Sequence, residues 1–358
     1  MSYIKEQLKE LSDKNFVFVP NTYNFLILTS YILNKYDIEL LLPSKYMLKN
    51  HIKNFRDLFI HWNCDSNERV SNERGSNERD SNERDGNLRK LDIPKFYKNK
   101  IKKFIENKDE RFLVFPLILH DKLKCNETPQ TSKITHTNII IYDKLNKSLE
   151  RFDPSNTTYY ESDKIDLDLF NVFTDKFNLK IEKQYSPTSI CLQKKGIQGL
   201  QEDEVYSNKI KVILGGNVGF CTMYSLLYLD MRLKYKKGLD SVYEPSDIIK
   251  MIIKKAERKG ISLTKMIVDY TYNLQQITKY VEDELQNKDQ IKFIYQYEEE
   301  EKKLKKNKMS EDDISKILLK KFGKTNSEIL QIIFSSIKKY FNLKRNEIIN
   351  NRNILSFL

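Results

Sequence analysis

The chain has 358 residues, of which 39% are hydrophobic, and it carries a formal net charge of +12. This length and apolar content suffice for a sizeable core, so we expect a globular protein of two or three domains. No run of about 18 uncharged apolar residues occurs, and the opening residues lack the apolar stretch of a signal peptide. We therefore expect a soluble intracellular protein with no membrane partner.

The basic charge raises the question of nucleic-acid binding, because clustered Lys and Arg gain affinity by displacing phosphate counterions. The lysines are spread along the chain, with one denser patch at 98–103, and no RNA-binding motif or zinc finger accompanies them. A nucleic-acid partner is therefore only weakly indicated. Lys, Asn, Ile and Tyr are abundant while Ala and Gly are scarce, which is typical of an AT-rich coding sequence.

The first part of the chain falls into a helical segment and a linker. Apolar stretches and a helix that we predict from Ser44 to Trp62 define a mainly helical N-terminal segment, 1–65. Four consecutive pentapeptides that begin with SNER then fill residues 66–85. A polar repeat of mixed charge cannot offset its ordering entropy by burial, so we predict a disordered linker over 66–88.

Residues 89–240 are predicted to form an α+β core. A short apolar run predicts a buried strand, two further strands flank a polar turn and form a hairpin, and a helix and a fourth strand follow. In chain order these elements lie at 111–119, 137–142, 148–152, 167–177 and 179–184.

The remainder, 241–358, is predicted to be a helical module. Ser246 has the position of a cap for a helix that Gly260 ends, and a long amphipathic helix follows from Ser262.

The predicted hairpin brings together a base and an acid. His136 precedes its first strand and Asp153 follows its second, and a hairpin centred between Lys144 and Leu145 places them directly opposite each other. Directly opposed residues have Cβ atoms about 5 Å apart. Asp153 could then accept a hydrogen bond from the imidazole and fix its tautomer. The alternative is an incidental surface pair at the end of a hairpin.

Cys221 opens an apolar segment that predicts a buried helix. A thiol at a helix N-terminus feels the positive end of the macrodipole, which favours the thiolate. Three glycines precede it, Gly215, Gly216 and Gly219, and they would let a substrate backbone approach closely. The alternative is a cysteine that merely packs beneath the helix.

The other cysteines carry weaker signals. Cys64, Cys125 and Cys191 form no CxxC pair, so we expect free thiols. Zinc binding by His61 and Cys64, completed by Cys125 or His136, lacks the usual paired spacing. We expect neither a metal nor another cofactor.

Together these motifs resemble a known family. The run HTNIIIYDKLNKSLERFDPSN at 136–156, followed by a glycine-preceded cysteine at the head of an apolar helix, resembles the superfamily of ubiquitin-like-protein proteases and adenovirus proteases. These enzymes read His, then Asp or Glu, then Cys along the chain. The segments ERFDP and GFCTMYSLLYLDMRL resemble a branch found in large DNA viruses. The resemblance covers about residues 110–236.

The resemblance implies a papain-like cysteine protease core, which is a small antiparallel or mixed sheet with a buried central helix, here flanked by helical N- and C-terminal segments. Cys221 would be the nucleophile, His136 the base and Asp153 the orienting acid. The substrate would be a protein, either a ubiquitin-like conjugate or a viral precursor, cut at a peptide or isopeptide bond. The location would be the host cytoplasm or the virion.

One position departs from the family pattern. Many members carry an oxyanion-hole Gln six residues before the nucleophile, where this chain has Gly215. Gln198, Gln201 and Asn217 are the alternative candidates for this role.

Two other functions stay open from the sequence. Acetyltransferases of bacterial effectors resemble the same superfamily and use the same residue order, although no acyl-CoA pocket is signalled here. A catalytically inactive homologue that acts as a binding scaffold through its helical C-terminal module is the second alternative.

Overall fold

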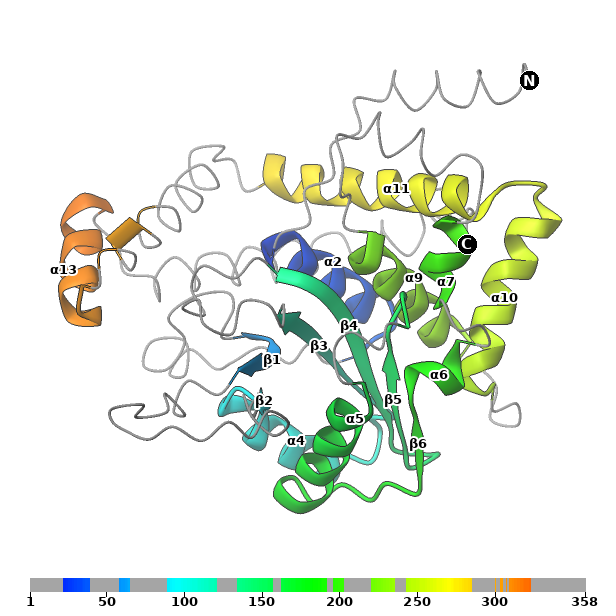
Figure 1. Ribbon diagram of the computed structural model, residues 1–358, viewed down its shortest axis with the longest axis horizontal. Helices are drawn as coiled ribbons and strands as arrows, with labels where there is room; N and C mark the ends of the chain where they lie inside the picture. Colours follow the sequence, from blue (N-terminus) through cyan, green and yellow to red (C-terminus); the bar gives the residue numbers. More distant parts are fainter. Residues whose placement is uncertain are drawn as a thin grey trace, which may run out of the picture.

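The computed structural model describes, in chain order, residues 22–38, 58–64, 89–120, 134–156, 162–191, 196–202, 220–235, 243–284, 300, 303–304, 307 and 309–322. Within these ranges the protein is α+β, with a mixed sheet at its centre and helices packed on both faces of that sheet (Figure 1). No helix in this part of the chain is long and apolar enough to cross a membrane.

The sheet has six strands in the order β2-β1-β3-β4-β5-β6. They are β1 (Ile60–Cys64), β2 (Arg89–Asp92), β3 (Phe112–His120), β4 (Ile134–Asp143), β5 (Ser148–Phe152) and β6 (Lys183–Tyr185). The β1–β3 and β5–β6 pairs are parallel and the other pairs are antiparallel. The strands predicted at 111–119, 137–142 and 148–152 are confirmed, whereas the fourth is reduced to the short edge strand β6.

The helices are spread along the chain, and after β6 the described elements are all helical. They are α2 (Thr22–Lys35), α4 (Phe96–Glu106), α5 (Ser162–Asn171), the π-helical turn η4 (Val172–Lys176), α6 (Pro187–Ile190), α7 (Gly196–Glu202), α9 (Phe220–Lys234), α10 (Pro245–Arg258), α11 (Leu263–Glu284) and α13 (Glu311–Phe322). Helix α9 is the predicted buried helix, since nearly every one of its side chains is buried.

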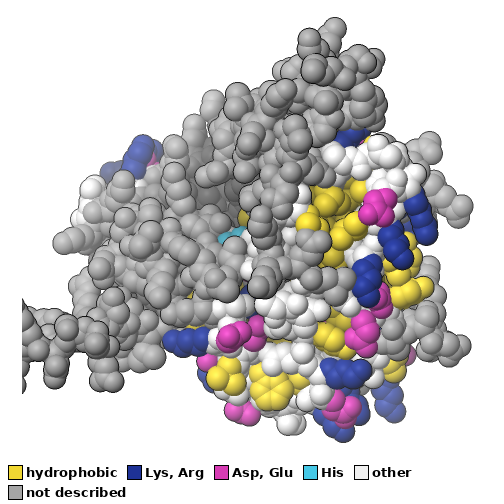
Figure 2. Space-filling model, turned by 45° about the vertical axis from the view of Figure 1, so that its right-hand side comes forward, with side chains coloured by type: hydrophobic (Ala, Val, Ile, Leu, Met, Phe, Trp, Pro, Cys, Tyr) yellow, Lys and Arg dark blue, Asp and Glu magenta, His cyan; other side chains and the backbone are white. Residues whose placement is uncertain are grey.

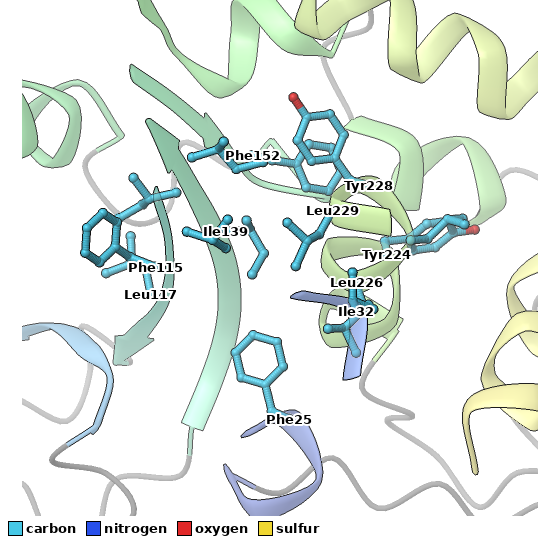
Figure 3. Packing of buried hydrophobic residues seen from close by; sticks show 14 of the residues in the cluster. Phe25, Ile32, Phe115, Leu117, Ile139, Phe152, Tyr224, Leu226, Tyr228 and Leu229 are labelled. Carbon is cyan, nitrogen blue, oxygen red and sulfur yellow. The ribbon is translucent and has the colours of Figure 1, made fainter. Parts of the chain in front are cut away.

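The central strands are buried on both faces, which explains their continuous apolar sequence. On one face Phe152 of β5 stacks on Tyr228 of α9, with ring centroids 4.1 Å apart (Figure 3). On the other face Phe115 of β3 contacts Tyr97 of α4 and Phe173 of η4, at centroid distances of 5.2 Å and 5.1 Å. Alternation along each strand thus supplies two cores, one beneath α9 and one beneath α4, α5 and η4.

Buried ion pairs fasten α9 to the sheet. Glu150 of β5 is fully buried and accepts hydrogen bonds from the Tyr228 hydroxyl at 3.0 Å and from Arg232 Nη2 at 2.6 Å. Asp143 at the end of β4 is also fully buried; its Oδ2 lies 3.6 Å from Arg232 Nη2 of α9, and both of its carboxylate oxygens bind Arg111. Because removing one partner of such a pair leaves a buried charge uncompensated, these contacts fix where α9 lies.

The N-terminal helix α2 is joined to the same core. Asp230 of α9 accepts hydrogen bonds from Lys35 Nζ at 2.7 Å and the Tyr36 hydroxyl at 2.6 Å, and the Tyr270 hydroxyl of α11 lies 3.5 Å from its other oxygen. Strand β1 likewise belongs to the segment 1–65 and pairs with β3. The division at 65, 88 and 240 stays a prediction.

Two local predictions are wrong. The helix expected from Ser44 to Trp62 gives way to strand β1 at its end, because pairing with β3 outweighs the local helical pattern; residues 39–57 lie outside the described residues. Helix α10 begins one residue before Ser246, with Glu244 as its cap and Pro245 in its first turn.

The predicted end of helix α10 and the predicted start of helix α11 are confirmed. Gly260 follows α10 with a φ of +62°, and the Ser262 hydroxyl caps α11 by accepting from the Lys265 backbone N–H at 3.0 Å. The predicted linker 66–88, which contains the SNER repeat, lies outside the described residues. On the face shown in Figure 2, basic and acidic side chains of described residues lie among one another.

Candidate active site

The β4–β5 hairpin has a different register from the one expected. Asp143 pairs with Ser148 around a turn over 144–147, so that the register continues to Asn138 opposite Asp153. The expectation that His136 directly opposes Asp153 is therefore wrong by two residues. Since side chains alternate between the faces of a strand, a shift of two leaves His136 and Asp153 on the same face.

The turn itself explains the shift. The Asp143 carboxylate accepts hydrogen bonds from the backbone N–H groups of Leu145 and Asn146, at 3.1 Å and 3.3 Å. Lys147 closes the turn with a φ of 48°, in the left-handed region. An Asp that binds the backbone two or three residues on is a strong turn former, so it moves the centre of the hairpin towards the C-terminus.

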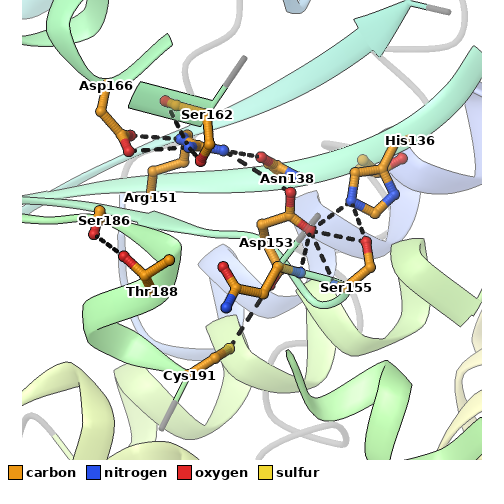
Figure 4. A network of polar contacts seen from close by, with 12 residues as sticks. His136, Asn138, Arg151, Asp153, Ser155, Ser162, Asp166, Ser186, Thr188 and Cys191 are labelled. Atoms are coloured by element: carbon orange, nitrogen blue, oxygen red, sulfur yellow. Dashed lines mark hydrogen bonds and ion pairs between the residues drawn. The ribbon is translucent and has the colours of Figure 1, made fainter. Parts of the chain in front are cut away.

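His136 and Asp153 meet across the end of the hairpin. His136 Nε2 lies 2.6 Å from Asp153 Oδ1, and the two residues are only 5% and 1% exposed (Figure 4). The same oxygen accepts the backbone N–H groups of Ser155 and Asn156 and the Ser155 hydroxyl, at 2.9, 3.1 and 3.0 Å. The Ser155 hydroxyl is also 2.9 Å from His136 Nε2. The turn after β5 therefore holds the carboxylate in one orientation.

A buried arginine lies behind the carboxylate. Arg151 Nη1 is 3.9 Å from the other oxygen of Asp153 and donates to Asn138 Oδ1 at 2.8 Å (Figure 4). Its remaining donors bind Asp166 and Ser162 of α5. Arg151 precedes Asp153 by two residues and so shares its face of the strand, which is how it reaches this position.

The environment favours the charged forms of both residues. Burial alone would raise the pKa of Asp153, but the charge and hydrogen bond of His136, with help from Arg151, hold it at about 2. Burial alone would lower the pKa of His136, but the charge and hydrogen bond of Asp153, together with the Cys221 thiol, raise it to about 10. The pair is thus an ionised carboxylate that stabilises an imidazolium.

Cys221 lies in the first turn of α9 with its thiol in hydrogen-bonding contact with His136. It is half-buried, in contrast to its neighbours in the helix. Burial raises its pKa, but the bond to His136, the charge of that ring and the backbone N–H groups of Thr137 and Thr222 outweigh it, so the pKa is lowered. Because Asp153 occupies Nε2, Nδ1 is the ring nitrogen left to face the sulfur.

The structure therefore brings the three predicted residues Cys221, His136 and Asp153 together in one chain of contacts. A thiol with a lowered pKa beside an imidazole with a raised pKa describes a thiolate–imidazolium pair. The thiolate is the nucleophilic form of cysteine.

Cys191 provides a contrast. It is buried, and its thiol lies 3.7 Å from the backbone oxygen of Asp153. Burial raises the pKa of Cys191 to about 12, so this thiol stays protonated. The described residues contain no group of three His, Cys, Asp or Glu residues that could hold a metal ion.

Of the three oxyanion candidates, Gln198 is the one whose side chain is described. Its backbone N–H donates to the Pro154 oxygen at 2.8 Å, which docks α7 on the turn after Asp153. Its Oε1 atom is buried without a hydrogen-bond partner among the described residues. Asn217 and the side chain of Gln201 lie outside the described residues.

Sequence reasoning missed the residues that support the three predicted ones. Ser155 and Arg151 bind the carboxylate, and their signal was their place in the hairpin: Arg151 is two residues from Asp153, and the observed register carries Ser155 towards His136. Thr137 follows His136 and Thr222 follows Cys221, and their backbone N–H groups contribute to lowering the pKa of Cys221; the sequence carries no separate signal for this contribution.

The described part of the chain is thus an α+β protein with a Cys–His–Asp arrangement at one end of its sheet. No family model matches it, and no solved structure matches it. The chain is 24% identical over 217 residues to the putative ankyrin repeat protein L371 of Acanthamoeba polyphaga mimivirus. This match covers 56% of the chain but only 26% of that relative, so the chain spans about a quarter of the length of the curated protein it matches.

Proposed function

We propose that this protein is a cysteine protease in which Cys221 is the nucleophile, His136 the general acid and base, and Asp153 the residue that orients His136. The observation that carries the proposal is the contact of a thiol of lowered pKa with an imidazole that is itself held by a buried carboxylate. Nucleophile, base and orienting acid within hydrogen-bonding reach define this kind of site.

The proposed reaction hydrolyses a peptide or isopeptide bond through an acyl-enzyme. The Cys221 thiolate attacks the carbonyl carbon, and the imidazolium of His136 gives its proton to the leaving amine as the C–N bond breaks. His136, now neutral, then takes a proton from water, whose oxygen attacks the thioester. Cleavage of the C–S bond releases the acid and restores the thiolate–imidazolium pair.

The fold supports a papain-like core in the sense of a mixed sheet with a buried helix that carries the nucleophile. Helix α9 lies on the sheet, its first turn carries Cys221, and the adjoining strand β4 carries His136. The backbone N–H of Cys221 and the Gln198 side chain are the proposed donors to the oxyanion. A Gln amide is suited to this role because it donates without titrating.

Protein substrates are the proposed class, either ubiquitin-like conjugates or viral precursor proteins. The partial match to a mimivirus protein supports an origin in a large DNA virus, and with it a site of action in the host cell or the virion. The printed name of that relative concerns ankyrin repeats and does not bear on the chemistry of this site.

Activity-based labelling tests the proposal. Ubiquitin and ubiquitin-like proteins with a thiol-reactive group at the C-terminus should label the wild-type chain and the Cys191→Ala variant, but not the Cys221→Ala variant. Labelling that survives Cys221→Ala would exclude this nucleophile.

A second arm covers precursor processing. Incubation with a library of unfolded peptides, read by mass spectrometry, should yield new N-termini with wild type and none with Cys221→Ala. If Cys221 reacts with small alkylating agents but neither arm shows turnover, an acetyltransferase or an inactive scaffold replaces the protease proposal.

A further inference from the structure

A pair of threonines lies directly beside the Cys221–His136 contact. Thr137 follows His136 in β4, Thr222 follows Cys221 in α9, and their hydroxyl oxygens are 3.2 Å apart. Residues 137 and 222 are 85 positions apart in the chain, and both are at least 95% buried. One hydrogen bond thus joins the immediate neighbours of the two reacting side chains.

A second hydrogen bond reinforces the first. The Ser225 hydroxyl, one helical turn after Thr222, donates to the backbone oxygen of Thr137 at 3.1 Å, and Ser225 is fully buried. Thr137 therefore hydrogen-bonds to α9 through both its hydroxyl and its backbone oxygen. These three groups, one on β4 and two on α9, prevent the first turn of α9 from sliding or rotating relative to β4.

The same two threonines contribute to the environment of the sulfur. The backbone N–H groups of Thr137 and Thr222 both contribute to lowering the pKa of Cys221. Because the two side chains bind each other, the position of one N–H group depends on the position of the other. Alternation along β4 sends the Thr137 side chain towards α9, which is the side from which Cys221 arrives.

We propose that Thr137, Thr222 and Ser225 form a positioning latch that holds Cys221 against His136. Loss of the latch should then make the Cys221 thiolate form less readily, although no reacting group is removed. This inference rests on the proposed function, in that it assigns a purpose to the Cys221–His136 contact. A hydroxyl pair can do this because buried polar groups hold a defined geometry that apolar packing alone leaves free to slide.

The experiment measures the rate of Cys221 alkylation by iodoacetamide between pH 4 and pH 10, with the modified peptide located by mass spectrometry. The midpoint of this profile reports how readily the thiolate forms. Thr222→Val removes the hydroxyl while keeping the shape, and should raise the midpoint by about half a pH unit, the scale of one ordinary hydrogen bond. Thr222→Ser keeps the hydroxyl and should leave the midpoint at the wild-type value.

Thr271→Val is the matched control. Thr271 is also a fully buried helical threonine, but its hydroxyl binds the Ile267 oxygen within α11. This variant should lose similar thermal stability without moving the midpoint. If Thr222→Val does not fold, Ser225→Ala removes the second bond of the latch and should raise the midpoint in the same direction.

Three outcomes overturn the latch. They are an unchanged midpoint in a folded Thr222→Val variant, an equal shift in Thr222→Ser, and an equal shift in Thr271→Val. Failure of the proposed function looks different: neither the ubiquitin-like probes nor the peptide library would then distinguish wild type from Cys221→Ala, whatever the alkylation midpoints of the threonine variants.

Discussion

His136 Nε2 lies 2.6 Å from Asp153 Oδ1 even though the two residues are offset by two positions in the hairpin register. The side chains bridge this diagonal because they share a face of the sheet, on which diagonal neighbours stay within reach of long or aromatic side chains. The offset leaves Asn138 opposite the carboxylate, where it receives a hydrogen bond from Arg151. The acid is therefore held from both sides, by His136 at one oxygen and by Arg151 near the other.

Asp153→Asn should make the thiolate of Cys221 form less readily. The amide has no charge to stabilise the imidazolium, so the pKa of His136 falls from its raised value and the pKa of Cys221 rises. We expect iodoacetamide alkylation of Cys221 at pH 6 to slow at least tenfold. Asp163→Asn, at an exposed acid in the first turn of α5, is the matched control and should react like wild type. Equal rates for Asp153→Asn and wild type would show that the carboxylate does not act on the thiol.

Stability should depend on the ionisation of Asp153 in acid. Its folded pKa of about 2 lies below its ordinary value of 3.8, so its contribution is present above pH 3.8 and is lost as the pH falls through 2. A shift of this size corresponds to about 2 kcal/mol. Urea unfolding at pH 5, 4, 3 and 2 should show the advantage of wild type over Asp153→Asn shrinking by about this amount. An advantage that stays constant over the series contradicts the assignment.

Gly196→Ala should disturb the turn after Asp153. Gly196 has a φ of +66°, and a Cβ built there would lie 2.5 Å from the Pro154 oxygen. Gly260→Ala is the matched control because Gly260 has a φ of +62° with nothing within 4 Å. The control should lose about 1 kcal/mol through backbone strain alone.

Gly196→Ala should lose clearly more stability than the control and should also slow alkylation of Cys221. Thermal unfolding and the alkylation rate, measured on the same samples, check both effects. Equal losses of stability in the two variants would mean that the contact between α7 and the turn does not contribute to stability.

Glu150→Gln should be strongly destabilising. The fully buried carboxylate neutralises Arg232 and accepts a hydrogen bond from the Tyr228 hydroxyl, so its loss leaves the buried cation with the more distant carboxylate of Asp143, at 3.6 Å. We expect a cost of about 3 to 5 kcal/mol in chemical denaturation. Glu182→Gln, which removes an exposed partner of Lys147, should change stability little. A small effect at Glu150 would mean that α9 is held by apolar packing rather than by its ion pairs.

Local sequence patterns predicted the helices and strands themselves better than the pairing between them. The strand expected at 111–119 and the buried helix that begins beside Cys221 follow from apolar runs, and the structure confirms both. The end of the helix expected up to Trp62 is instead strand β1, because its pairing partner in β3 lies more than 50 residues further along the chain. A window of neighbouring residues carries no information on such a partner.

The register of the hairpin shows the same limit at shorter range. The turn was correctly placed between the two strands, but the side chain of Asp143 selects residues 144–147 as its tip. Asp143 is itself held by Arg111, which immediately precedes the neighbouring strand β3. A contact from outside the hairpin thus takes part in fixing how its two strands align.

The sequence alone determined the order His, Asp, Cys of the three residues along the chain. It also determined that a hairpin carries the first two and that a helix begins at the third. The hairpin brings His136 and Asp153 together through local pairing. The contact between Cys221 and His136 was decided only by the tertiary structure, because the two residues are 85 positions apart and meet only when α9 packs on the sheet. Contacts with Glu150 and Thr137 set that packing, and the charges and hydrogen bonds that it brings together outweigh burial and shift the pKa of each of the three groups.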